Sequence, residues 1–345
     1  MAPRALLCPH CGATLPPEAR TRLVVCVYCK ASVTCDEDFV SAAAFKRALS
    51  ALDAPDTLET PALGPTLEKV WVAGLPYRLI GRLARGESTD VHLATRARRI
   101  TERVIIKLLR APGDADLLDR EWAVIAALQK SEAQGASRFT QRIPEPVSRG
   151  ILARAGNETP ALIYRYKSGF HHSLTQVSTA YPGGVEAHHG VWIWRRLLEL
   201  LGWVHRSGFA HGAVLPQHVI LHARDHGADL VGFSCAVRLA GDERLPAVSA
   251  AQHAYYPPEL IEGARPSAAS DIAMSARVVI GVLGGNPATG ALPAAIPDSV
   301  ATILHAYAAL DRSLTRDAWT LREEVGRAAH RAFGPPRYHP FTMPE

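Results

Sequence analysis

Four cysteines near the start of the chain are spaced to bind one metal ion. They form two pairs, Cys8 with Cys11 and Cys26 with Cys29, with two residues inside each pair. This spacing lets both sulfurs of one turn point at one ion, and two such turns complete a tetrahedron. We expect a structural zinc ion, because a closed four-sulfur site leaves no position for a substrate.

The segment around these cysteines resembles a zinc ribbon. It contains the strand-like run Leu23-Val24-Val25 and is too short to bury much apolar surface, so metal binding would supply its folding free energy. His10 lies inside the first pair, but four cysteines already complete the ligand set. Cys35 and Cys235 are left over, and we expect each to be a plain small side chain.

The next motifs in the chain are typical of a site that holds nucleotide phosphates. Residues 79–94 have the outline of a glycine-rich hairpin in which only Gly86 of three glycines is present. The apolar run Val104-Ile105-Ile106 ends on Lys107, and the helical pattern over 119–128 offers Glu121 as its ion-pair partner. Together these motifs resemble the small lobe of the protein-kinase family, in which such a pair stands beside the phosphates of ATP.

The resemblance to protein kinases continues through the second half of the chain. Residues 161–166 resemble the strand before the interlobe hinge, and residues 192–205 resemble the helix before the catalytic loop. The run Tyr255-Tyr256-Pro257-Pro258-Glu259 resembles the A-P-E motif, whose glutamate would pair with Arg316. Ser270-Asp271-Ile272 resembles the start of the central helix of the large lobe, where the aspartate braces the catalytic loop.

The implied fold is α+β: a two-lobed protein-kinase-like domain preceded by a small zinc-ribbon domain. We place the ribbon at residues 1–35, and a linker with a short helix at 42–52 and several prolines at 36–75. The kinase-like domain follows at 76–335, with a small lobe at about 76–167 and a large lobe at about 168–335. Residues 336–345 form a C-terminal tail.

Three positions that carry kinase chemistry hold other residues. In His211 to Leu221, which resembles the H-R-D-L-x-P-x-N-I-L loop, Ala213 replaces the aspartate that accepts the substrate proton, and His218 replaces an asparagine that helps to hold magnesium. In Leu230 to Ser234, Gly232 replaces the metal-binding aspartate of D-F-G. Phosphoryl transfer depends on positioning and on charge neutralisation by metal, so we predict that the chain is not an enzyme but a pseudokinase.

Neighbouring residues do not restore the missing groups. Asp225 fits the turn before the D-F-G position, and Asp229 lies on the strand three residues before Gly232. His218 has the chemistry of a transition-metal ligand or a base, but a single loop histidine is more often structural. Gly212 replaces the arginine that would pair with a phosphorylated activation loop, which removes the usual phosphorylation switch.

The expected function is a binding or regulatory scaffold in signalling. Gly86, Lys107 and Glu121 would hold ATP or another nucleotide without magnesium, and the ribbon would dock a protein partner. One alternative is an atypical active phosphotransferase, marked by magnesium-dependent nucleotide consumption that Lys107→Ala abolishes. A second alternative is a nucleic-acid-binding regulator that uses the ribbon cations Arg20, Arg22 and Lys30, although three scattered cations are few for tracking phosphates.

Composition is consistent with a cytoplasmic protein. The 345 residues are 48% hydrophobic and 21% charged, with a net charge of +5. No apolar run approaches the roughly 20 residues that span a bilayer, and the first residues lack the apolar core of a secretory signal. We therefore expect no membrane partner.

Overall fold

The computed structural model describes residues 23–25, 32–34, 68–97, 99–154, 157–309 and 317–344. The predicted zinc ligands Cys8, Cys11, Cys26 and Cys29 and the predicted helix at 42–52 lie outside the described residues. Strand β1 (Leu23–Val25) pairs antiparallel with β2 (Ser32–Thr34). The second cysteine pair therefore lies, in the sequence, between two strands that pair with each other.

Six antiparallel strands of the small lobe close into a barrel. They are β3 (Lys69–Val72), β4 (Leu75–Arg85), β5 (Thr89–Arg96), β6 (Arg99–Leu109), β7 (Pro146–Arg154) and β8 (Asn157–Arg165). Their order is β3-β4-β5-β6-β8-β7. Alternate side chains fill the interior, among them Val70, Tyr77, Ile106 and Ile163. Because β3 begins at Lys69, the barrel starts inside the range predicted as linker.

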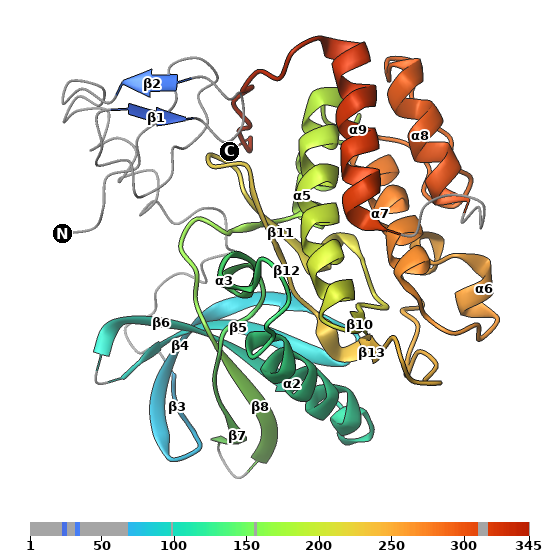
Figure 1. Ribbon diagram of the computed structural model, residues 1–345. Coiled ribbons are helices and arrows are strands. Elements are labelled where there is room, and N and C mark those ends of the chain that lie inside the picture. The colour runs from blue at the N-terminus through green and yellow to red at the C-terminus, as the bar shows by residue number, and fades with distance from the viewer. Residues whose placement is uncertain are drawn as a thin grey trace.

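Helix α2 (Ala115–Gln129) lies beside the barrel and reaches the large lobe (Figure 1). Its buried residues Leu118, Glu121, Ile125 and Leu128 recur every three or four positions, which is the spacing of one helical face. A carboxylate on that apolar face requires a partner, so the face itself positions Glu121 for an ion pair. The short helix α3 (Ala136–Phe139) follows before the chain returns to β7.

Helices form most of the large lobe (Figure 1). They are α4 (Leu174–Ala180), α5 (Ala187–Arg206), α6 (Pro258–Ile261), α7 (Ala268–Val282), α8 (Asp298–Ala308) and α9 (Ala318–Phe333). Helix α7 is buried almost all round and packs against α5 and α8. None of the helices in the described ranges is both long and apolar enough to span a membrane.

Short strands carry the loops that face the small lobe. Strand β11 (Val219–His222) lies between β12 (Gly227–Leu230) and β9 (His172–Ser173), and β10 (Phe209–Ala210) pairs with β13 (Val237–Arg238). The predicted catalytic-loop segment therefore runs from β10 to β11, and the predicted D-F-G position follows β12. This topology brings the two segments to one place, where His211 reaches Val231.

The tail after α9 packs back on the large lobe. Phe341 is 4% exposed and lies against Trp192 of α5, with ring centroids 6.0 Å apart. Tyr338 stacks on His226 at 4.5 Å, and His226 stacks on Trp192 at 4.3 Å. Burial, together with the nearby charge of His189, lowers the pKa of His226 to about 3. The imidazole is therefore neutral at physiological pH, which suits its place between two aromatic rings.

Candidate functional site

The structure brings Lys107 of β6 and Glu121 of α2 together as predicted. The Lys107 Nζ donates to Glu121 Oε2, and the side chain of Glu121 is 2% exposed. The Tyr164 hydroxyl of β8 donates to Glu121 Oε1 at 3.2 Å. Burial and the neighbouring Glu121 charge raise the pKa of Tyr164 well above its usual value, so the hydroxyl keeps its proton. Sequence reasoning missed Tyr164, because a tyrosine in an apolar strand is normally core.

The loop that contains Gly86 makes a tight turn between β4 and β5. Its amide donates to Thr89 O at 2.8 Å, and a Cβ at this position would lie 3.2 Å from the same oxygen. Glycine therefore fits the turn, although the other two glycines of the kinase pattern are absent. Arg110 donates to Gly86 O at 2.6 Å, which fixes the loop against the end of β6.

The tip of the same loop contacts the large lobe. Glu87 Oε1 accepts hydrogen bonds from Ser249 Oγ and from the Ala251 amide, both at 3.1 Å. A second contact between the lobes pairs Arg120 of α2 with Glu243. The loop that contains Gly86 and helix α2 are thus both joined to the large lobe. No sequence signal pointed to these contacts, because they join positions more than 100 residues apart.

Asp271 of α7 holds the predicted catalytic loop. Its fully buried carboxylate accepts from the His211 amide at 2.7 Å and from the Gly212 amide at 2.9 Å. His205 Nε2 donates to the same group at 2.9 Å. The aspartate predicted to brace the catalytic-loop backbone therefore does so, and these bonds offset the cost of burying its charge.

His211 connects the catalytic loop to the segment after β12. Its Nε2 donates to Val231 O at 3.0 Å, and the Phe233 ring packs edge-on against the imidazole at 4.6 Å. Burial lowers the pKa of His211, so the ring is neutral at physiological pH. His211 therefore links the predicted catalytic loop to the segment that contains the predicted D-F-G position.

The predicted pair between the A-P-E glutamate Glu259 and Arg316 stays a prediction. Arg316 lies outside the described residues. Within those residues, Glu259 Oε2 is buried and accepts no hydrogen bond. Burial lowers the pKa of Arg277 on α7, and the charge of Glu259 raises it by a smaller amount. The Arg277 guanidinium donates a hydrogen bond to Tyr256 O at 3.0 Å.

The three positions that lack kinase residues lie together. Ala213 is 2% exposed, and its carbonyl accepts from His218 Nδ1 at 2.8 Å. Gly232 has a φ of +79°, and a Cβ added there would lie 2.5 Å from His218 Cδ2. The imidazole of His218 therefore fills the space where a side chain at position 232 would begin.

His218 carries no charge in this setting. Burial, with the charge of His211 and to a smaller extent that of Lys107, lowers the pKa of His218 to about 3. The ring is therefore neutral above that pH, and its Nδ1–H donates a hydrogen bond to a backbone carbonyl. A base for substrate deprotonation works best with a pKa near the operating pH, which His218 does not have.

The acids near the site have other partners. Asp229 Oδ2 accepts from Lys167 Nζ at 2.8 Å, and its Oδ1 lies 3.7 Å from Arg142. Asp225 lies 3.3 Å from His222 in the turn before β12. Across the described part of the chain, no three His, Cys, Asp or Glu side chains are arranged so that they could hold a metal ion.

No protein-family model and no curated protein matches this sequence. Among solved structures, it is similar to the kinase domain of a Toxoplasma gondii specific rhoptry antigen. The TM-score is 0.54 at 15% sequence identity, and the match covers 83% of this chain and 93% of that one. The chain has a protein-kinase-like fold. The predicted two-lobed α+β architecture is confirmed, and the likeness at this identity concerns the fold alone.

Gly232→Asp should destabilise the protein. Its Cβ would collide with His218, and the backbone is in the left-handed region, so we expect a loss of roughly 2–4 kcal/mol in the free energy of unfolding. The double variant Gly232→Asp/His218→Asn should recover most of it, because the smaller side chain frees the space. Denaturant unfolding measures both.

Gly241→Asp serves as the matched control, since the nearest atom to an added Cβ there is 3.7 Å away and φ is not positive. It should be close to neutral. A Gly232→Asp variant as stable as this control would contradict the position assigned to His218.

Proposed function

We propose that the chain is a pseudokinase, a protein-kinase-like domain that works by binding and not by phosphoryl transfer. One observation carries the proposal: the neutral ring of His218 fills the space next to Gly232 where a metal-binding carboxylate would stand. Ala213 offers no group to accept a proton. Both losses fall on the groups that neutralise and position the transferred phosphoryl, so the reaction has no means of stabilising its transition state.

The acids near the site support this proposal over an atypical phosphotransferase. Asp229 forms ion pairs with Lys167 and Arg142, and Asp225 lies beside His222. Freeing Asp229 for magnesium would leave Lys167 and Arg142 without their shared acidic partner in a partly buried site, which is costly. No second function is favoured by a specific contact.

We further propose that the cleft holds ATP or a related nucleotide without magnesium. Lys107 is 14% exposed and is aligned by Glu121, so its ammonium is already in position for a phosphate. Gly86 leaves its own position in the loop between β4 and β5 free of a side chain. Because the ion pair between Lys107 and Glu121 is already formed, binding requires no further free energy to align Lys107. A ligand that binds only the folded state raises the stability of the protein.

ATP should therefore raise the melting temperature equally with magnesium and with a chelator. Lys107→Ala should lose the shift, because the phosphates lose their cation. Thermal unfolding at several ATP concentrations measures this, and Lys167→Ala, which removes a lysine bonded to Asp229, is the comparison for the loss of one buried cation. A shift that requires magnesium would contradict the missing metal site, and no shift with any nucleotide would leave an empty cleft.

The N-terminal cysteines supply the second part of the proposal. We propose that Cys8, Cys11, Cys26 and Cys29 bind one structural zinc ion and that this ribbon docks a protein partner in the cytoplasm. The spacing of the thiolates supports it, as does the pairing of β1 with β2 on either side of the second cysteine pair. A hairpin of this size needs a metal ion to fold alone.

Purified protein should contain about one zinc ion per chain by elemental analysis. Cys11→Ser should lower the zinc content to near zero, whereas Cys235→Ser, which changes a buried thiol of the large lobe, should retain it. Equal zinc content in the two variants, or iron in place of zinc, would contradict the assignment.

A further inference from the structure

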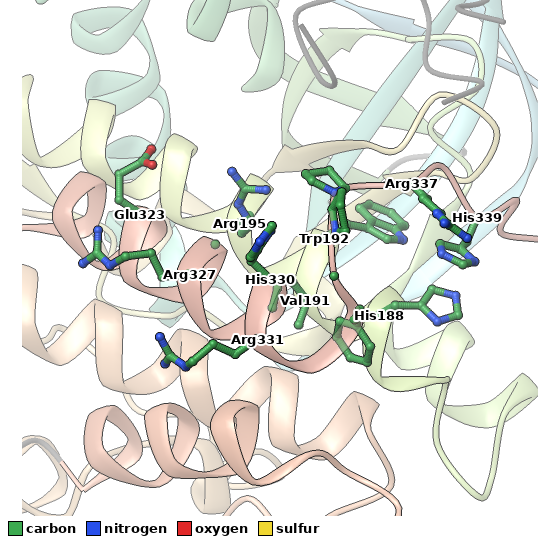
Figure 2. A pocket seen from close by; sticks show the side chains of 16 residues that line it. His188, Val191, Trp192, Arg195, Glu323, Arg327, His330, Arg331, Arg337 and His339 are labelled. Carbon is green, nitrogen blue, oxygen red and sulfur yellow. The ribbon is translucent and has the colours of Figure 1, made fainter. Parts of the chain in front are cut away.

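A pocket in the large lobe lies apart from the cleft that contains Lys107. It opens between α5, α9 and the tail that follows α9, and its volume is about 510 Å³. Figure 2 shows the side chains that these three segments turn toward it. Small-molecule sites have volumes of roughly 300–1,000 Å³, so the pocket has the size of a ligand site.

One side of the pocket is apolar. Val191 and Trp192 come from α5, Phe333 is the last residue of α9, and Pro335 and Pro336 begin the tail. Phe333 is 40% exposed, one of the few large hydrophobic side chains in the described residues that face water. An aromatic ring left in water next to a cavity favours an apolar occupant, since burial of its surface is worth about 25 cal/mol per Å².

The pocket also contains a cation with an unused hydrogen-bond donor. Arg195 Nε is buried and makes no hydrogen bond to any described group, and the guanidinium lies along the backbone of Gly326, 3.6 Å from where a Cβ would stand. Burial, followed by the charges of Arg322 and Arg196, lowers the pKa of Arg195 and outweighs the opposite effect of the nearby acids Glu199 and Glu323. A half-buried guanidinium with an unused donor is a cost that the fold alone does not offset, and an anion would offset it.

The charges around the mouth have the same sign. Arg327 and Arg331 of α9 and Arg337 of the tail also line the pocket, and Glu323 is its one acid. Glu323 already accepts from Arg322. In Figure 2 Arg327 and Arg331 point away from Arg195, and Arg337 lies on the other side, near His339. These arginines therefore attract anions to the mouth, whereas Arg195 is the cation placed to contact one.

We propose that this pocket binds an organic anion, with its phosphate or carboxylate group on Arg195 and its apolar body against Trp192 and Phe333. The planar guanidinium suits both acidic groups, which it binds through paired N–H donors. The apolar wall distinguishes such a ligand from inorganic phosphate. This site is independent of the nucleotide cleft and of the zinc ribbon.

Isothermal titration calorimetry with octyl phosphate, octanoate, inorganic phosphate and neutral octyl glucoside tests the proposal, each ligand below its micelle concentration. We expect octyl phosphate or octanoate to bind at least tenfold more tightly than both inorganic phosphate and octyl glucoside. The stronger of the two identifies the acidic group. Equal binding of the neutral detergent would overturn the role of charge, and equal binding of inorganic phosphate would overturn the role of the apolar wall.

Two variants locate the site. Arg195→Gln should weaken binding at least tenfold without lowering the melting temperature, because the guanidinium has no described hydrogen bond to lose. Ala329→Phe, which places a large side chain among the residues that line the pocket, should also abolish binding. Arg165→Gln, on the small lobe, should bind as the unaltered protein does. Unchanged binding in both Arg195→Gln and Ala329→Phe would overturn the proposal.

Discussion

The carboxylate of Asp271 is the group on which the arrangement of the site depends. It is fully buried and accepts hydrogen bonds from the backbone amides of His211 and Gly212. Helix α7 of the large lobe therefore fixes the loop that follows β10. His211 then fixes the next segment through Val231 and Phe233. Between these two segments the His218 ring donates to Ala213 O and lies next to Gly232. A buried charge that satisfies several donors is costly to remove, because each donor would lose its acceptor in a place that water does not reach.

In our proposal, this domain keeps the residues that hold the kinase-like fold and lacks those that would transfer a phosphoryl group. Lys107, Glu121 and Asp271 are each held by partners inside the protein, and they occupy the positions that a kinase fold assigns to them. At Ala213, His218 and Gly232 the partners would have been a substrate and a metal ion. In our proposal, a neutral imidazole hydrogen-bonded to the backbone has taken over the space and made it part of the core. The same cleft would then hold a nucleotide as a ligand and leave it intact.

Sequence reasoning could predict the fold and the Lys107–Glu121 pair, because these depend on short motifs whose spacing is visible in the chain. The prediction that Ala213, His218 and Gly232 leave the domain without kinase chemistry also comes from the motifs, and it stays a prediction. Sequence reasoning could not predict that the His218 ring lies against Gly232, since a motif shows which side chain is absent and not where its replacement points. The contact of Glu87 with Ser249, the early start of the barrel at Lys69 and the pocket around Arg195 all depend on tertiary packing between distant segments, which leaves no periodic signal in the sequence.

Transfer of labelled γ-phosphate from ATP is the most direct measurement of the central claim. The purified protein would be incubated at micromolar concentration with ATP and either magnesium or manganese, and both released phosphate and labelled protein would be counted beside the Lys107→Ala variant. A pseudokinase should give no signal above that variant with either metal. Metal-dependent transfer or hydrolysis that Lys107→Ala abolishes would contradict the claim and would make the chain an active phosphotransferase.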